Sequence, residues 1–391
     1  MPQIEQLEIR NYKVLAHVRL EKIGPFSVLV GPNACGKSTL LDVFGFLADC
    51  LETNVRVALQ RRGGLREVRS RERTGPIVIE LKYRQNPNEP LLTYHLEIDE
   101  NEEGQPVVLK ENLKGGRQRG QRGAPYYFLR FERGEGEALD GDAVRLQRAP
   151  ILQAVESPDI LAIKGLGQLA NYPHIARFRR FMEGWFLSYF VANRARESTT
   201  AGYAEHLSRE GENLALVIQY LQEKHGPVLG KIVERLARCV PGLEGLQIEQ
   251  TVDGRVVLQV KDTPFARPFT ARYVSDGTMK MLAYLVLLND PAPPPLMCIE
   301  EPENNLHPRL LAPLAEEFRA HAHQTQIFIS SHSPYFVDAL QLTELWWMER
   351  GPDGYARIGR VADRAVVEAL VREQLTLGSL WFEGHLGGGN P

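Results

Sequence analysis

Residues 31–39, GPNACGKST, have the spacing G-x-x-x-x-G-K-[ST], which lets backbone amides fold around phosphate oxygens. A β-rich apolar run, FSVLV at 26–30, precedes the motif, and a helix is predicted after it at 37–49. In this context Lys37 can reach the β- and γ-phosphates of a nucleotide, and the Ser38 hydroxyl can ligate Mg²⁺. The residues predicted to bind phosphate are Gly31, Pro32, Asn33, Ala34, Cys35, Gly36, Lys37, Ser38 and Thr39.

A second segment, LMCIEEPENNLHP at 296–308, ends an apolar run in two adjacent glutamates. Carboxylates are rarely buried without a partner, so either the strand ends at the surface or a cation lies there. Since the same chain carries a phosphate-binding motif, we expect Glu300 to hold Mg²⁺ directly or through water. We expect Glu301 to polarise the water that attacks the γ-phosphate. The alternative is a solvated pair of capping residues after a core strand.

Two further segments carry groups that suit an anion. In YVSDGTMKMLAYLVLL, at 273–288, Ser275 is at an N-cap position and Gly277 follows before an apolar helix. In TQIFISSHSPYFVD, at 325–338, a strand is followed by His332, which can donate to a γ-phosphate. Taken alone, these are also typical of an ordinary capped helix and of a histidine with a local partner. Together with the first two motifs, their order and spacing along the chain make a nucleotide site the more specific interpretation.

A chain of 391 residues is too long for one simple core, so two or more lobes are expected. Alternating apolar residues and glycine or asparagine turns predict an antiparallel meander in the N-terminal part. Its strands are predicted at 4–10, 16–20, 77–83, 91–98, 106–110 and 126–132. From about 150 to 240 the apolar period becomes helical, and strands return at about 245–260.

The chain therefore reads as an α/β protein in three segments. Residues 1–145 form an N-terminal lobe with the phosphate-binding motif and the antiparallel meander, and 146–262 form an inserted helical and β lobe. Residues 263–391 form a C-terminal lobe that carries Ser275, the glutamate pair and His332.

The composition is ordinary for a globular protein, with 43% hydrophobic and 24% charged residues. The net charge of −3 gives no global basic field, so any nucleic-acid binding must come from local patches. The start of the chain lacks the apolar core of a signal peptide, and the apolar run at 281–288 is too short to span a bilayer. Four cysteines, Cys35, Cys50, Cys239 and Cys298, show no metal-ligand spacing. These features predict a reduced, cytoplasmic protein without a membrane partner.

Two clusters of basic residues are candidates for a nucleic-acid surface. The first is Arg61, Arg62, Arg66, Arg69, Arg71 and Arg73, and the second is Lys114, Arg117, Arg119 and Arg122. They predict contacts with the phosphate backbone of DNA or RNA, or else a solvated loop with interspersed glutamates. Cys35 offers a similar choice, between a small filler residue and a thiol whose modification blocks the nucleotide site.

The motifs together resemble the ABC-type ATPases of the SMC/RecF group, and most closely the stand-alone AAA-family ATPases related to the OLD proteins. The matching segments are IEQLEIRNYKVL, GPNACGKST, VSDGT, IEEPENNLHP and ISSHSPYFVD, which run from end to end of the chain. The resemblance implies an ABC-type P-loop ATPase head with an antiparallel β lobe and an inserted helical lobe. It identifies GPNACGKS as Walker A, VSDGT as the signature, Glu300 and Glu301 as the end of Walker B, 305–307 as the D-loop and His332 as the switch histidine.

The resemblance also implies a head-to-tail homodimer that closes around Mg-ATP, with Ser275 and Gly277 of one subunit on the γ-phosphate held by the other. The sequence departs from the wider ABC pattern, because Glu300 replaces the usual Walker B aspartate, the signature reads SDG, and the D-loop acid is His307. These changes fit the OLD-like branch better than a transporter. The glutamine that normally ligates magnesium has three candidates, Gln60, Gln147 and Gln153.

The expected function is an ATP-driven switch of prokaryotic DNA repair or phage defence, acting on nucleic acid or on a separate nuclease-like effector. About fifty residues follow the His332 segment, fewer than a further domain of usual size needs, so we expect no Toprim nuclease in this sequence. Two alternatives stay open. One is the ATP-binding module of a transporter, and the other is an ATP-dependent scaffold with little hydrolysis.

Overall fold

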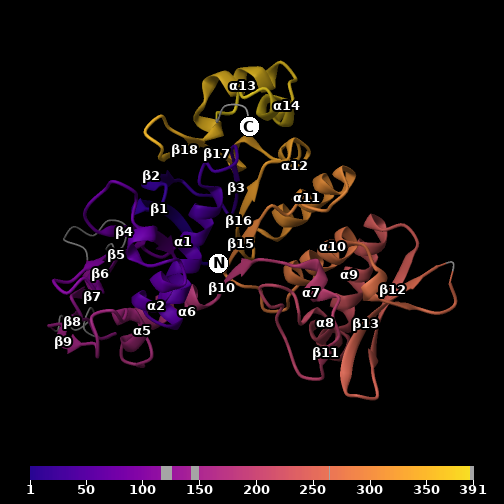
Figure 1. The fold of residues 1–391 in the computed structure, drawn as a ribbon, viewed down its shortest axis with the longest axis horizontal. Coiled ribbons are helices and arrows are strands. Elements are labelled where there is room, and N and C mark those ends of the chain that lie inside the picture. Colours follow the sequence, from indigo (N-terminus) through magenta and orange to yellow (C-terminus); the bar gives the residue numbers. More distant parts are fainter. Residues whose placement is uncertain (116–125, 142–148, 264, 388–391) are drawn as a thin grey trace.

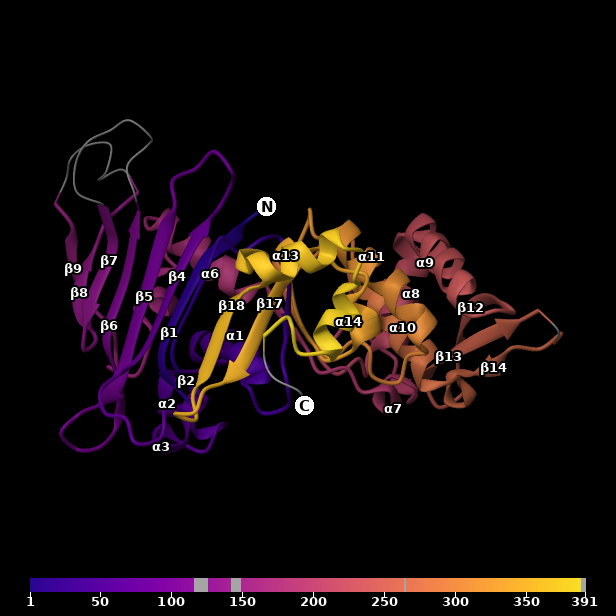
Figure 2. The same cartoon turned by 90° about the horizontal axis from the view of Figure 1, so that it is seen from above.

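The computed structural model describes residues 1–115, 126–141, 149–263 and 265–387. Three sheets organise the chain, as Figure 1 shows. A large antiparallel sheet lies at one end, a mostly parallel sheet lies in the middle, and a small antiparallel sheet lies with helices at the other end (Figure 2). The expected α/β fold with an antiparallel lobe is therefore confirmed.

The antiparallel lobe is an eight-stranded sheet with the order β2-β1-β4-β5-β6-β7-β8-β9. Every neighbouring pair in it is antiparallel, as the predicted meander requires. The strands are β1 (Gln3–Tyr12), β2 (Leu15–Glu21), β4 (Ile77–Arg84), β5 (Leu92–Glu100), β6 (Pro106–Gly115), β7 (Tyr126–Glu132), β8 (Glu135–Ala138) and β9 (Ile151–Ala154). In β4 the buried residues alternate with half-buried ones, which is the period expected of a sheet with one face on the core.

The central sheet has six strands in the order β10-β15-β16-β3-β17-β18. Its first five strands run parallel, and β18 closes the edge in the antiparallel direction. The strands are β3 (Phe26–Val30), β10 (Trp185–Ser188), β15 (Leu296–Glu300), β16 (Gln326–Ser331), β17 (Leu345–Arg350) and β18 (Ala356–Arg360). The small third sheet consists of β11 (Thr199–Thr200), β12 (Leu243–Gln250), β13 (Arg255–Asp262) and β14 (Phe269–Thr270).

Helices cover both faces of the central sheet (Figure 1). The α-helices are α1 (Lys37–Glu52), α2 (Val55–Gln60), α3 (Leu65–Val68), α5 (Ala162–Leu166), α6 (Pro173–Glu183), α7 (Ala192–Ala195), α8 (Leu214–Lys224), α9 (Gly226–Cys239), α10 (Asp276–Leu288), α11 (Leu311–His321), α12 (Pro334–Val337), α13 (Ala365–Arg372) and α14 (Leu377–Phe382). Short 3₁₀ turns are η1 (Ala271–Tyr273), η2 (Pro308–Leu310), η3 (Leu342–Glu344) and η4 (Val361–Asp363). No helix among the described residues combines the length and apolarity that crossing a membrane requires.

The central sheet separates two hydrophobic cores. In β3, Leu29 faces the core shared with the antiparallel lobe and α1, whereas Val28 and Val30 face the core shared with α10 and α11. A strand that is buried on both faces must be apolar throughout, which is why FSVLV shows no alternation with polar residues. On the first face, Phe44 of α1 packs its ring 5.1 Å from the ring of Phe328 and 5.5 Å from that of Trp185.

The segment 146–262 contributes to both cores, because α5 and α6 pack in the first and α8 and α9 in the second. The buried side chain of Gln326 joins the central sheet to the antiparallel lobe. Its amide donates to the carbonyls of Ile4 (2.8 Å) and Gly24 (3.1 Å), and its oxygen accepts from the Ile4 amide (2.8 Å). Because a buried amide with unmet hydrogen bonds is costly, these contacts fix how the two sheets meet.

Candidate nucleotide-binding site

The carboxyl ends of three neighbouring strands bring the main predicted motifs together. β16 lies between β3 and β15, and Ser331 pairs with Val30 while Ser330 pairs with Glu300. With neighbouring strands about 4.8 Å apart, the ends of β3 and β15 lie about 10 Å from each other. Ligands of open α/β sheets bind outside the carboxyl ends of the strands. The Walker A loop, the glutamate pair and His332 all start from this edge.

The Walker A loop has the backbone that the motif requires. Gly36 has a φ of 110° and Ala34 a φ of 61°, so the loop turns through left-handed conformations just before α1 begins. A Cβ atom on Gly31 would lie 2.3 Å from the carbonyl oxygen of Met348, which leaves room for glycine alone. The loop is therefore held tightly against β17, with its amides next to the N-terminus of a long helix.

Lys37 is the first residue of α1 and is 6% exposed. Its ammonium donates to the carbonyl oxygens of Gly31 (2.6 Å) and Pro32 (3.0 Å). The positive charge thus lies inside the loop and beside the positive end of the helix dipole. Both features favour an anion such as a nucleotide phosphate.

Ser38 and Glu300 form a pair of oxygen ligands suited to magnesium. Burial raises the pKa of Glu300, and the negative charges of Glu301 and Asp42 raise it further, whereas a hydrogen bond from Ser38 and the charge of Lys37 lower it. Glu300 and Glu301 are adjacent half-buried carboxylates at this edge, and a cation would relieve the repulsion between them. Magnesium is commonly held by one or two protein oxygens together with substrate phosphates and water, so these residues fit it. Among the described residues no cluster of three or more His, Cys, Asp or Glu has the arrangement of a metal site.

Asp42, on α1 behind this edge, accepts three hydrogen bonds. They come from the Tyr12 hydroxyl (2.8 Å), the Lys13 ammonium (2.6 Å) and the Arg62 guanidinium (2.8 Å). Burial works to raise the pKa of Asp42, but the charges and hydrogen bonds of Arg62 and Lys13 outweigh it, so the pKa is lowered. Asp42 therefore stays ionised and anchors α1 to β1.

This network changes the interpretation of the first arginine cluster. Arg62 also donates to Asp49 (2.7 Å), Arg61 pairs with Asp49 (2.8 Å), and Arg69 pairs with Asp99 and with Glu100 (3.3 Å). Three of the six predicted phosphate contacts are thus engaged in internal ion pairs. The other three, Arg66, Arg71 and Arg73, are exposed, and Arg73 lies 4.6 Å from the centre of the Tyr355 ring.

In the second cluster Lys114 lies near the end of β6. Arg117, Arg119 and Arg122 lie outside the described residues.

Glu301 and His332 lie side by side across β15 and β16. His332 Nδ1 is 3.4 Å from Glu301 Oε1, and the His332 side chain is 47% exposed. The other carboxylate oxygen of Glu301 accepts from the side-chain amide of Asn304 (2.8 Å), which fixes the direction of the carboxylate. An oriented carboxylate next to a half-exposed imidazole can accept a proton from water and present a donor to a phosphate.

The signature residues lie at the N-terminus of α10. Ser275 is exposed and accepts from the Thr278 amide (3.2 Å), as predicted for an N-cap. A Cβ atom on Gly277 would lie 2.6 Å from the carbonyl oxygen of Asn305. Asp276 accepts from Asn305 (3.2 Å) and from Arg196. Gly277 and Asp276 therefore contact the D-loop residue Asn305, whereas Ser275 lies at the surface.

Some residues at this edge were not predicted from the sequence. β10, with the sequence WFLS, falls in a region whose period predicted helices, and its end places Ser188 opposite Ile299 and Tyr189 next to Glu300. Burial raises the pKa of Tyr189, and the charges of Asp42 and Glu300 raise it further. A four-residue strand carries too little pattern to be seen in the sequence.

Two of the three candidate glutamines for magnesium, Gln60 and Gln153, lie among the described residues. Gln153 is in β9 of the antiparallel lobe, where its amide donates to the Tyr172 hydroxyl (3.2 Å). Gln60 ends α2, and Gln147 lies outside the described residues.

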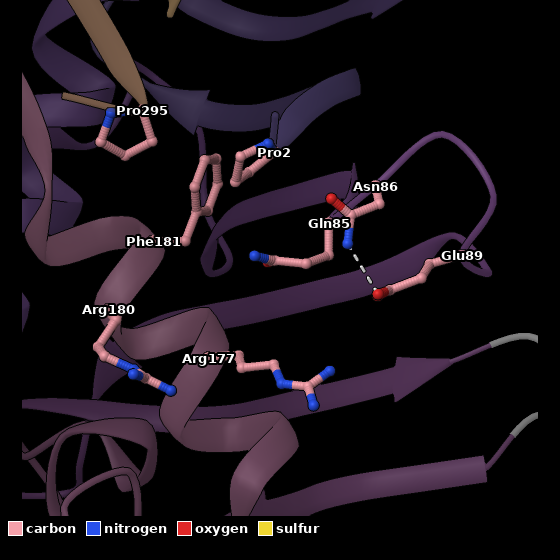
Figure 3. A pocket seen from close by; sticks show the side chains of 8 residues that line it. All are labelled: Pro2, Gln85, Asn86, Glu89, Arg177, Arg180, Phe181 and Pro295. Carbon is pink, nitrogen blue, oxygen red and sulfur yellow. Dashed lines mark hydrogen bonds between the residues drawn. The ribbon is translucent and has the colours of Figure 1, made fainter. Parts of the chain in front are cut away.

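A separate cavity of about 560 Å³ lies at the amino end of β15, on the other side of the central sheet from the carboxyl ends of its strands. Pro295, at the amino end of β15, lines it, so it is about 16 Å of strand away from Glu300. Figure 3 shows Gln85 and two of the arginines of α6, Arg177 and Arg180, among the side chains that line it. The cavity is therefore no part of the nucleotide edge.

Comparison with known proteins identifies the family to which the chain belongs. A family model described as "AAA domain, putative AbiEii toxin, Type IV TA system" matches residues 26–338, which run from β3 past His332. The chain belongs to this AAA-domain family. No curated protein sequence matches the chain.

Solved structures that resemble this AAA-domain protein include heads of SMC proteins. One is an SMC head bound to the C-terminal winged-helix domain of ScpA, with 12% identity, a TM-score of 0.56, and coverage of 91% of this chain and 96% of that chain. Another is the SMC head with an extended coiled coil bound to the C-terminal domain of ScpA, derived from Pyrococcus furiosus, with 12% identity, a TM-score of 0.52, and coverage of 96% and 100%. At this identity they establish the fold, which is that of an ABC/SMC-like AAA ATPase head.

Proposed function

We propose that this AAA-domain protein is an ATP-hydrolysing switch that closes as a head-to-tail homodimer around Mg-ATP. The observation that carries the proposal is the convergence of the Walker A loop, Glu301 and His332 at the carboxyl ends of β3, β15 and β16. Each of these segments is far from the others in the sequence, and the sheet places all three on one edge. The family and the fold support the same class of activity.

In this proposal the Walker A amides and Lys37 bind the phosphates of ATP. Ser38 and Glu300 would hold Mg²⁺, which would neutralise charge on the phosphates. Glu301, oriented by Asn304, accepts a proton from the attacking water. His332 donates from the adjacent strand end to the γ-phosphate.

The second subunit would complete the site through its signature turn. Ser275 is exposed at the N-terminus of a 13-residue helix, where backbone amides and the helix dipole favour an anion. Gly277 keeps the turn close to the D-loop of its own subunit. In a head-to-tail dimer, Ser275 and Gly277 of one copy would lie on the γ-phosphate bound to the other copy.

The switch would act on a partner, for which a separate nuclease-like effector in DNA repair or phage defence is our proposal. The SMC heads that share this fold are recorded bound to domains of ScpA, which supports a partner-binding ATPase. Nucleic acid would contact the exposed arginines Arg66, Arg71 and Arg73. Lys114 lies toward the other end of the antiparallel sheet and would belong to a separate surface. All four cysteines are free thiols, which fits the reducing cytoplasm.

The deciding experiment measures phosphate release by the purified chain in saturating Mg-ATP, with and without DNA and RNA, together with the mass in solution of Glu301→Gln. We expect turnover in the wild type and an ATP-dependent dimer in the variant. Tight ATP binding without turnover under every condition would favour an ATP-dependent scaffold instead. A nucleic-acid response that is lost in the combined Arg66→Ala, Arg71→Ala and Arg73→Ala variant would support the proposed surface.

A further inference from the structure

Lys280 is a buried cation on the signature helix that the proposed hydrolysis does not use. It lies in the second turn of α10 and is 9% exposed. Its ammonium donates to the carbonyl oxygens of Glu301 (3.1 Å) and Asn304 (3.1 Å). A lysine is almost never buried unless its charge is compensated, so these two contacts need a reason.

The two carbonyls belong to the turn that presents the proposed general base. Glu301 has a φ of 42°, a left-handed conformation that is unfavourable for a residue with a side chain. The turn is closed by a hydrogen bond from the Asn304 amide to the Glu301 carbonyl (3.1 Å). Lys280 donates to that same carbonyl, and so stabilises a backbone that would otherwise tend to relax.

Glu303 holds the turn from the opposite side. It is 7% exposed, and one carboxylate oxygen accepts from the Ser331 hydroxyl (2.7 Å) and from the His332 amide (2.9 Å). Its other oxygen is buried without a hydrogen-bond partner among the described residues. The turn 301–304 is therefore attached on two sides. Lys280 bonds it to the signature helix, and the Glu303 carboxylate bonds it to the segment that carries His332. The opposite charges of Lys280 and Glu303 attract each other across the turn.

The same helix touches the turn a second time. Gly277, one turn before Lys280, packs against the backbone carbonyl of Asn305, and the Asp276 carboxylate accepts from the side-chain amide of Asn305. A displacement of the N-terminus of α10 must therefore move the segment 301–305.

We propose that Lys280 is a positioning residue for ATP hydrolysis, which with Glu303 holds the turn 301–304 and couples the signature helix to Glu301 and His332. This inference rests on the proposed function, because it assigns to Lys280 the task of orienting its general base. When a nucleotide bound to the partner subunit fixes the position of the signature turn, α10 would also be fixed. Lys280 would then hold the Glu301 side chain in its catalytic position.

The environment of Lys280 gives the coupling a pH dependence. Burial lowers the pKa of Lys280 to about 8, although the charges of Glu303 and Glu301 raise it. The other groups that face this turn are His332 from the end of β16 and Tyr284 on α10, whose ring centre lies 5.9 Å from the ammonium. Above about pH 8 the ammonium loses a proton, and its charge-assisted bonds to the two carbonyls weaken.

The test compares Lys280→Met, Lys280→Arg and the control Lys231→Met, which changes an exposed lysine on α9. We expect kcat of Lys280→Met to fall about tenfold or more, since small misplacements of catalytic groups have large effects, and the affinity for ATP to stay within about twofold. Hydrogen exchange at amides 301–306 should become faster in Lys280→Met and stay unchanged in the control. In Lys280→Arg the fall of wild-type kcat above about pH 8 should disappear, because arginine keeps its proton.

The failure of this inference differs from the failure of the proposed function. A wild-type chain without ATP turnover would overturn the proposed function, while the exchange of amides 301–306 would still decide whether Lys280 holds the turn. Wild-type turnover together with unchanged kcat and unchanged exchange in Lys280→Met would overturn the inference. If Lys280→Met does not fold, Lys280→Arg still tests the inference. A kcat that falls above about pH 8 in Lys280→Arg as it does in the wild type would overturn it.

Discussion

The Nδ1 atom of His332 lies 3.4 Å from Oε1 of Glu301 and 3.7 Å from Oε1 of Glu303. The imidazole therefore sits against two carboxylates of different exposure, since Glu303 is buried and Glu301 is half-buried. Glu303 accepts from the His332 backbone amide and so fixes the position of the residue, whereas Glu301 meets its side chain. One glutamate positions the histidine, and the other is free to serve the chemistry.

This arrangement predicts the behaviour of Glu301→Gln. The amide keeps the shape of the side chain but cannot accept a proton from water, so ATP should bind normally and hydrolysis should fall by about a hundredfold or more. The unhydrolysed nucleotide should then hold two copies together. Light scattering in saturating Mg-ATP should give the mass of a dimer.

The matched control is Glu373→Gln, an exposed glutamate just after α13, which should hydrolyse ATP and form no ATP-dependent dimer beyond the wild-type level. A Glu301→Gln protein that stays monomeric with ATP bound would argue strongly against the head-to-tail arrangement.

The parts of the site that the sequence predicts are those defined by local spacing. The Walker A glycines can be predicted because the local backbone structure at each position favours glycine. Gly36, for example, has a φ of 110°. The strands β3, β15 and β16 are visible because a strand buried on both faces reads as an unbroken apolar run. Their shared edge follows from the rule that such strands run parallel and end together.

The parts that the sequence does not predict depend on contacts between distant segments. From the sequence, Arg62 is predicted to be part of an exposed basic cluster. In the structure it forms ion pairs with Asp42 and Asp49 of α1. Lys280 reads as a polar residue in an apolar helix, since only the turn after β15 supplies its acceptors. In each case the partner lies well outside the window that a local pattern covers, so the charge could not be assigned to the surface or to the interior.

Gly277→Ala tests the packing of the signature turn on the D-loop. The new Cβ would lie 2.6 Å from the Asn305 carbonyl oxygen, so the turn must shift away. ATP should still bind the P-loop of the same chain, while turnover falls about tenfold or more because the catalytic segment is displaced. Equilibrium binding of a fluorescent ATP analogue and phosphate release measure the two effects separately.

Gly230→Ala is the control for that variant, because this glycine of α9 has no atom within 4 Å of the added Cβ. It should keep full turnover and gain about 0.5–1 kcal/mol of helix stability. Equal turnover in both alanine variants would contradict a role for the contact between Gly277 and Asn305.

Lys37→Ala should abolish ATP binding. The ammonium is the main positive side chain inside the Walker A loop, and its loss should lower turnover by about a hundredfold or more. Isothermal titration with Mg-ATP checks the binding, and Lys231→Ala, an exposed lysine on α9, should bind as the wild type does. Wild-type affinity in Lys37→Ala would place the nucleotide elsewhere.

Cys35 should be slow to react with thiol reagents although it lies in the Walker A loop. Burial raises the pKa of the Cys35 thiol, against a smaller opposing effect of Lys37, so little thiolate is present near neutral pH. Mass spectrometry after iodoacetamide at pH 7.5 should find the half-buried Cys239 modified before Cys35. Rapid modification of Cys35 with loss of turnover, absent in Cys35→Ala, would show that the thiol is accessible.

Glu111 should make the stability of the antiparallel lobe depend on pH. This fully buried carboxylate of β6 accepts from the Tyr94 hydroxyl (3.0 Å) and from the Ala162 and Ile163 amides (2.5 and 3.2 Å) at the start of α5. Burial raises the pKa of Glu111 to about 7, although the three donors lower it, from 4.5 in the unfolded chain. Between these pH values the folded protein keeps a proton that the unfolded chain has lost.

The free energy of unfolding should therefore decrease as the pH rises from about 4.5 to 7, by up to about 3 kcal/mol from this group. Urea unfolding at pH 5, 6, 7 and 8 measures the slope. Glu111→Gln should flatten that slope, because the amide does not titrate, and should be less stable at pH 5, because its NH₂ group faces a backbone donor. The exposed Glu373→Gln should keep the wild-type slope, and an identical slope in Glu111→Gln would mean that other groups carry the pH dependence.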